Sequence, residues 1–182
     1  MNIRNFMTGL LVRKKLGALV CLALLSIGCG SAKIDTAAQK EGETLANEAS
    51  AVYKKSQQSI SFDNKYSWDT AVNMDDEKTR NGKFTAAAKD LEAAKDKFSQ
   101  ASAKMKQAMN GQDKFASAET KTLAQKSQTY KMWSDLAEFE RKTLQDASTM
   151  TDKKALIQKL TEAQAERDKM NKELMDYMKV TN

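Results

Sequence analysis

The chain has 182 residues with 30 basic and 24 acidic side chains, and it contains no histidine and no proline. Without histidine there is no imidazole base and no histidine metal ligand, which excludes the commonest forms of acid–base and zinc catalysis. Without proline, a chain rich in alanine, lysine, glutamine and glutamate favours long uninterrupted helices.

Residues 1–28 have the charge and hydropathy pattern of a cleaved signal peptide. Basic residues occur at Arg4, Arg13, Lys14 and Lys15 with no acidic residue, and an apolar run follows over residues 16–27. Crossing a bilayer takes roughly 20 apolar residues, so this run is too short to span one. We therefore expect cleavage after Gly28.

The stretch from Leu25 to Cys29 places a small residue and a cysteine at the end of this apolar run. It resembles the lipobox of bacterial lipoproteins. Its leucine lies four residues before the cysteine, one position further from it than is usual, and this spacing is similar to the relaxed lipobox of spirochaetal lipoproteins. The resemblance covers about the first 30 residues. It implies that Cys29 becomes the mature N-terminus and carries a thioether-linked diacylglycerol and an amide-linked acyl chain.

The sequence leaves two alternatives to lipidation at Cys29. Cys21 follows Val20, which is too large for the small-residue position of a lipobox, and choosing Cys21 would leave a very short apolar run. An ordinary secretory signal with Cys29 near the cut is the other alternative, because short motifs also arise by chance. The lipoprotein interpretation implies a bilayer partner through Cys29 and a place in the cell envelope, expected at the outer membrane, on either face.

Removal of the signal peptide changes the charge of the chain. Residues 1–28 hold four of the 30 basic residues and none of the 24 acidic ones, so 26 basic and 24 acidic residues remain. Nucleic-acid binding requires a concentrated basic face, so we expect no nucleic-acid partner. The lysine excess between Lys83 and Lys106 is interpreted as a solvated helix face.

After a short tether at residues 29–33, a helical bundle is expected over residues 34–182. A weak alanine-rich helix is predicted from about residue 34 to 56, with inward positions at Ile34, Ala38, Leu45, Ala49 and Val52. At roughly 3.5 Å per residue, the tether would keep the bundle within about 20 Å of the bilayer.

Residues 57–82 are predicted to be irregular and to lie at the end of the bundle far from the membrane. Phe62, Tyr66 and Trp68 are the candidate contact residues for a protein partner, because aromatic side chains are enriched at interfaces. The alternative is that these aromatics fold down as a lid over the end of the core. The acidic residues at 75–77 do not have EF-hand spacing, since Lys78 stands where a glycine is needed, and no metal site is expected.

The next segment predicts a helix over residues 84–109 with a heptad seam. Large residues recur at every seventh position and alanines follow three residues later: Phe84, Leu91, Phe98, Met105, Ala87, Ala94, Ala101 and Ala108. A tight reversal is expected at Asn110 and Gly111. Pairs such as Phe84 with Phe139 and Leu91 with Met132 should then face each other.

A helix over residues 114–147 is predicted from a broad apolar face, and a last helix follows the cap-rich residues 148–152. The inward positions are Leu123, Tyr130, Trp133, Leu136, Ala137, Leu144 and Ala147 in the first, and Leu156, Leu160, Ala163, Met170, Leu174 and Tyr177 in the second. Arg167 interrupts the second seam without an obvious partner. The fold class is all-α: an antiparallel up-down bundle of three to four long helices with coiled-coil-like packing.

The sequence carries no catalytic or cofactor motif, and the lipid on Cys29 is the one covalent group expected. The expected function is that of a non-enzymatic, membrane-anchored module that binds an envelope or host protein. A structural or self-associating envelope scaffold is the alternative. A lipid or small-ligand carrier comes third, because alanine seams pack too closely to leave a ligand cavity.

Overall fold

The computed structural model describes residues 33–62 and 65–180, with the side chains of residues 63–67 left out. Its helices are α2 (Thr36–Ser59), α3 (Lys65–Met74), α4 (Glu77–Ala108), α5 (Ala118–Ala147) and α6 (Lys153–Val180). The predicted signal peptide at residues 1–28 and the predicted lipidation site Cys29 lie outside the described residues. No described helix combines the length and the hydrophobicity that a membrane span requires.

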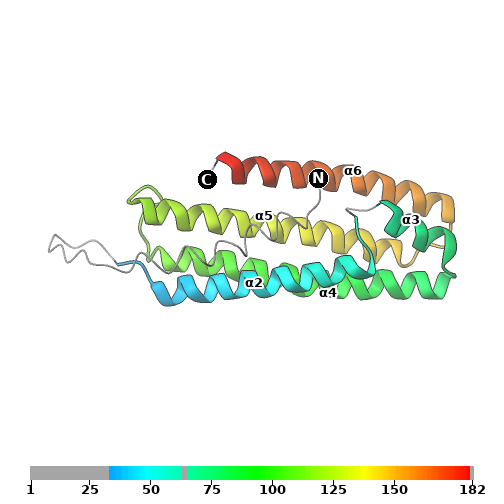
Figure 1. The fold of residues 1–182 in the computed structure, drawn as a ribbon, viewed down its shortest axis with the longest axis horizontal. Helices are drawn as coiled ribbons and strands as arrows, with labels where there is room; N and C mark the ends of the chain where they lie inside the picture. The colour runs from blue at the N-terminus through cyan, green and yellow to red at the C-terminus, as the bar shows by residue number, and fades with distance from the viewer. Residues whose placement is uncertain (1–32, 63–64, 181–182) are drawn as a thin grey trace. The chain divides into compact units, whose positions relative to one another are not determined.

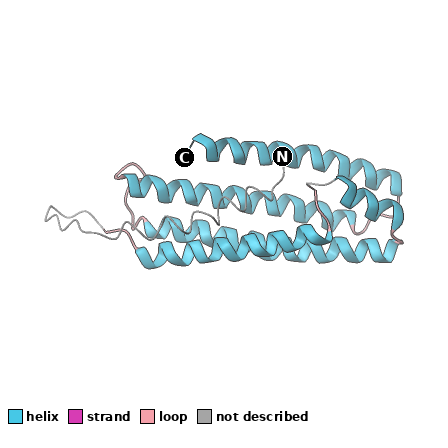
Figure 2. Cartoon of the chain, viewed as in Figure 1, coloured by secondary structure: helices cyan, strands magenta, loops and turns pink. Residues whose placement is uncertain are grey.

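The four long helices alternate in direction, and each packs against its neighbours in the chain order α2, α4, α5 and α6 (Figure 1). The short helix α3 packs against α6 near the start of α6. The described residues contain only helices and connections (Figure 2). The predicted all-α antiparallel bundle is thereby confirmed.

Each long helix begins at a side chain that accepts a hydrogen bond from a backbone N–H in its first turn. Asp35, Asp76, Ser117 and Asp152 accept from the N–H groups of Ala38, Thr79, Thr120 and Ala155. These bonds satisfy donors that have no partner within the helix. Asp76, one of the three acidic residues at 75–77, is therefore a helix cap.

The heptad seam of α4 lies in the core as predicted. Phe84, Leu91, Phe98 and Met105 are at most 2% exposed, and the four alanines of the same seam are fully buried. Phe98 stacks on Trp133 of α5, with the ring centroids 5.8 Å apart. Tyr53 of α2 packs against the same indole edge to face, with the centroids 5.5 Å apart. This aromatic cluster joins α2, α4 and α5.

The predicted register between α4 and α5 is wrong. Ser102 Oγ lies 3.0 Å from Ser127 Oγ, whereas the predicted pairing would have placed Ser102 opposite Lys121. The cause is the connection between the helices. Asn110 and Gly111 do adopt the left-handed conformation, with φ of 51° and 76°, but the chain makes further turns before α5 begins at Ala118. The longer connection shifts every facing pair along α5.

The segment 57–82, predicted to be irregular, is largely helical. Helix α2 continues to Ser59, α3 occupies residues 65–74, and α4 begins at Glu77. The apolar residues of α3 have no long heptad pattern because the helix is short, and its inward face, with Ala71 and Val72 buried, is defined by contact with α6. A ten-residue helix of this kind depends on tertiary packing for its stability.

Candidate functional site

Two of the three aromatic residues predicted to contact a partner are in the core. Phe62 and Trp68 are completely buried, and the Trp68 indole N–H donates a hydrogen bond of 3.2 Å to Gln164 Oε1 on α6. The Tyr66 side chain lies outside the described part of the chain. For Phe62 and Trp68 the exposed-patch hypothesis is therefore wrong, and the lid alternative describes their position. The physical reason is that burial of large aromatic surfaces stabilises the end of the bundle more than exposure would.

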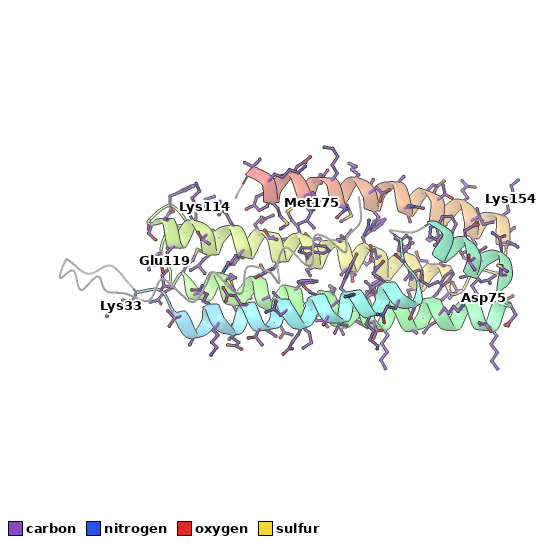
Figure 3. The ribbon with its side chains drawn as sticks, viewed as in Figure 1. Lys33, Asp75, Lys114, Glu119, Lys154 and Met175 are labelled. Carbon is purple, nitrogen blue, oxygen red and sulfur yellow. The ribbon has the colours of Figure 1, made fainter. Side chains whose placement is uncertain are left out.

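Among the residues of α3 whose side chains are described, 68–74, the exposed ones are two polar residues and one methionine. Thr70 and Asn73 are exposed, and Met74, at the end of the helix, is 81% exposed. Figure 3 shows Asp75, which follows α3, at the end of the bundle opposite Lys33. Helix α3 thus contributes Trp68 to the core and presents Met74 to solvent at the end of the bundle opposite Lys33.

A buried polar network lies between α2, α5 and α6, and it was not predicted. Glu140 on α5 is fully buried and accepts hydrogen bonds from Arg167 Nε at 3.0 Å, Tyr53 Oη at 2.8 Å and Gln57 Nε2 at 3.1 Å. Arg167 is 2% exposed. The guanidinium compensates the carboxylate charge inside the core, where an uncompensated charge would be strongly unfavourable.

The Tyr53 hydroxyl is held in its neutral form in this network. Burial raises the pKa of the Tyr53 phenol well above its usual range, and the adjacent Glu140 carboxylate raises it further. Tyr53 is therefore a hydrogen-bond donor to Glu140 at any physiological pH. With its oxygens accepting from three side chains, Glu140 is arranged as a structural acceptor and not as an exposed acid or base.

The sequence did contain a signal for this network. Arg167 occupies a seam position of α6, between Ala163 and Met170, and Glu140 follows Ala137 by one helical turn on the apolar face of α5. Two opposite charges on faces that both point inward indicate a buried ion pair. Only the tertiary arrangement shows that the two side chains meet at the same level.

No described residues form a cluster of three or more histidine, cysteine, aspartate or glutamate side chains that suits a metal ion. Most described acids outside the network form surface ion pairs with lysine or arginine, such as Glu138 with Arg141 at 2.7 Å and Glu43 with Lys126 at 2.6 Å. Their chemistry is that of a solvated bundle surface.

Comparison with known protein families, curated protein sequences and solved structures found no match for the chain.

Proposed function

We propose that this protein is a cell-envelope lipoprotein, anchored to the outer membrane by acyl chains on Cys29, whose helical bundle acts by binding another protein and not by catalysis. The lipobox-like stretch ending in Cys29 supports the anchor. The histidine-free composition and the commitment of Glu140, Arg167 and Tyr53 to one another support a non-enzymatic role.

The position of α3 carries the proposal for where a partner binds. Because the long helices alternate in direction, α3 lies at the end of the bundle opposite Lys33, where the tether enters (Figures 1 and 3). A partner approaching from the aqueous side meets this end first. The contact is therefore assigned to the outward face of α3 around Met74, in place of the buried Phe62 and Trp68.

The anchor is tested with Cys29→Ala in the full chain. We expect the variant to leave the membrane fraction, to move out of the detergent phase and to lose incorporation of labelled palmitate, because two or more acyl chains are needed for stable anchoring. A variant that is still processed, still partitions into detergent and still takes up palmitate would contradict the lipoprotein proposal.

The partner contact is tested with a photo-crosslinking amino acid placed at Met74 in intact cells. Thr122, an exposed position on α5 near the opposite end, is the matched control. We expect a discrete adduct from position 74 and none from position 122. Failure to form an adduct at Thr70, Asn73 and Met74 alike would contradict a binding role for α3. Protease treatment of intact cells then shows on which face of the membrane the contact is made.

The second candidate function is a self-associating scaffold, favoured by the C-terminal half of α6. After Arg167 this half has one fully buried apolar residue, Leu174, while Met170, Met175, Tyr177 and Met178 are only partly buried. A second copy packed there would bury more of these side chains. Light scattering of the lipidated protein in detergent distinguishes the two functions, because a scaffold predicts a mass that increases with concentration.

A further inference from the structure

The connection between α4 and α5, residues 109–117, carries the most exposed aromatic side chain of the described residues. Phe115 is 73% exposed, and Lys114 Nζ lies 4.9 Å from the centre of its ring. The Phe115 N–H donates to Asp113 Oδ1 at 2.7 Å, which holds the loop backbone in place. A single exposed apolar residue is common on protein surfaces, so its location decides whether it has a role.

The same connection is bonded to the start of the described chain. Asn110 Nδ2 donates to the carbonyl oxygen of Lys33 at 3.3 Å, and the Asp35 N–H donates to the carbonyl oxygen of Ala108 at 2.9 Å. Figure 3 shows Lys33, Lys114 and Glu119 at one end of the bundle, with Asp75 and Lys154 at the other. Residue 33 is thereby fixed beside the loop that exposes Phe115.

The chain length between Cys29 and Lys33 limits how far this end can be from the lipid anchor. Four residues reach at most about 14 Å at roughly 3.5 Å per residue. With acyl chains on Cys29 inserted in a bilayer, the loop at residues 109–117 would lie within reach of the headgroup region. The apolar ring of a phenylalanine can be buried at the boundary between headgroups and acyl chains, while a neighbouring lysine buries its aliphatic stem and keeps its ammonium group in the hydrated layer.

We propose that this loop is a second membrane contact of the protein, in which Phe115 inserts into the headgroup region of the bilayer that holds Cys29 and so orients α3 away from the membrane. The inference rests on the proposed lipidation of Cys29. An open hollow of about 310 Å³ adjoins Phe115 and is lined by Lys114, Lys121 and Tyr177 among others, which provides space and two ammonium groups for lipid headgroups.

The charges at this end indicate the lipid composition that the contact needs. Basic and acidic residues are nearly balanced: Lys33, Lys106, Lys114 and Lys121 against Asp35, Asp113 and Glu119. A patch with so little net charge gains little from anionic lipids. The contact is therefore expected on zwitterionic phosphatidylcholine vesicles as well.

The test uses the full lipidated protein in phosphatidylcholine vesicles whose acyl chains are brominated near the headgroup. Phe115→Trp places a fluorophore in the loop, and Met74→Trp is the matched control, because both positions are highly exposed and lie at opposite ends. The native Trp68 and Trp133 are 0% and 7% exposed and provide the same background in both variants. We expect the emission added by Phe115→Trp to be mostly lost in brominated vesicles and that of Met74→Trp to be unchanged.

Two results would overturn the membrane contact: no quenching of Phe115→Trp, or equal quenching of both variants. The mass of the purified protein is measured first and reports whether Cys29 is acylated. An unacylated chain overturns the lipoprotein proposal and this inference with it. An acylated chain in which Phe115→Trp is not quenched overturns this inference alone.

Discussion

The packing of α4 against α2 and the packing of α6 against α5 differ in the kind of side chains that each interface buries. In the buried part of the interface between α2 and α4, the contacts are made by small and apolar side chains, and ion pairs such as Lys97 with Glu48 lie at its rim. At Gly42 of α2 an added Cβ would lie 2.7 Å from Met105 Cε and 3.2 Å from the Ala101 carbonyl oxygen. Between α5 and α6, a fully buried carboxylate and guanidinium lie in the core. The buried part of the first interface is therefore close and apolar, and that of the second depends on the compensation of charge.

This difference has a consequence for how each interface responds to change. Apolar packing loses free energy in proportion to the volume removed. A buried ion pair loses little when both charges are replaced together, but much when one charge is left without the other. Substitutions in the two interfaces therefore separate these two responses.

The largest effect is expected at the buried network. Glu140→Met should lower the free energy of unfolding by about 3–5 kcal/mol, because it leaves the Arg167 guanidinium and the Tyr53 and Gln57 donors without their buried acceptor. The double variant Glu140→Met, Arg167→Met should recover part of this loss. Urea unfolding of the double variant and of the two single variants, Glu140→Met and Arg167→Met, measures the coupling, and strictly additive losses would show that the two residues do not act as a pair.

The next largest effect is expected on the α4 seam. Leu91→Ala removes a fully buried side chain and should lower the free energy of unfolding by about 2–5 kcal/mol. Lys95→Ala is the control one turn away, since Lys95 is partly exposed and its pairs with Asp96 and Glu138 lie at the surface. Similar losses for the two variants in chemical denaturation would contradict the heptad assignment.

A smaller effect distinguishes Gly82 of α4 from Gly42 of α2. Gly82→Ala in α4 has open space around the added Cβ and should stabilise the protein by about 0.5–1 kcal/mol through helix propensity. Gly42→Ala should instead be destabilising, because the new Cβ would meet Met105, Lys104 and the Ala101 carbonyl at short distances. If thermal unfolding shows equal stabilisation by both, the close approach of α2 to α4 is not present.

The smallest effect concerns the surface carboxylate Glu138. The hydrogen bonds from Arg141 lower the pKa of the Glu138 carboxyl from its usual value of 4.5 to about 2. A carboxyl with a depressed pKa in the folded state contributes stability above pH 4.5, and this contribution is lost as the pH falls towards 2. Glu138→Gln should therefore lower the melting temperature slightly at pH 7, and the difference from the unchanged protein should vanish near pH 2. A difference that does not depend on pH would contradict this origin.

Long-range features account for what could not be predicted about the fold and the candidate site. The seams of α4, α5 and α6 follow from a helical period that is visible in any sequence window, so most of their buried apolar residues were identified correctly, although Tyr130, Met170 and Tyr177 are only partly buried. The register of α4 against α5 depends on the length of the connection, whose further turns after Gly111 have no strong sequence signal. Helix α3 is too short to show periodicity, which is why residues 57–82 were interpreted as irregular.

The sequence by itself therefore determined the all-α class, the antiparallel order of the long helices and most of their inward faces, because these follow from local spacing and caps. The tertiary structure decided that Trp68 points into the core, that Glu140 meets Arg167 and that Asn110 bonds to Lys33. Each of these facts joins residues that are distant in the chain. Their energies depend on burial and charge compensation between helices, which no local pattern specifies.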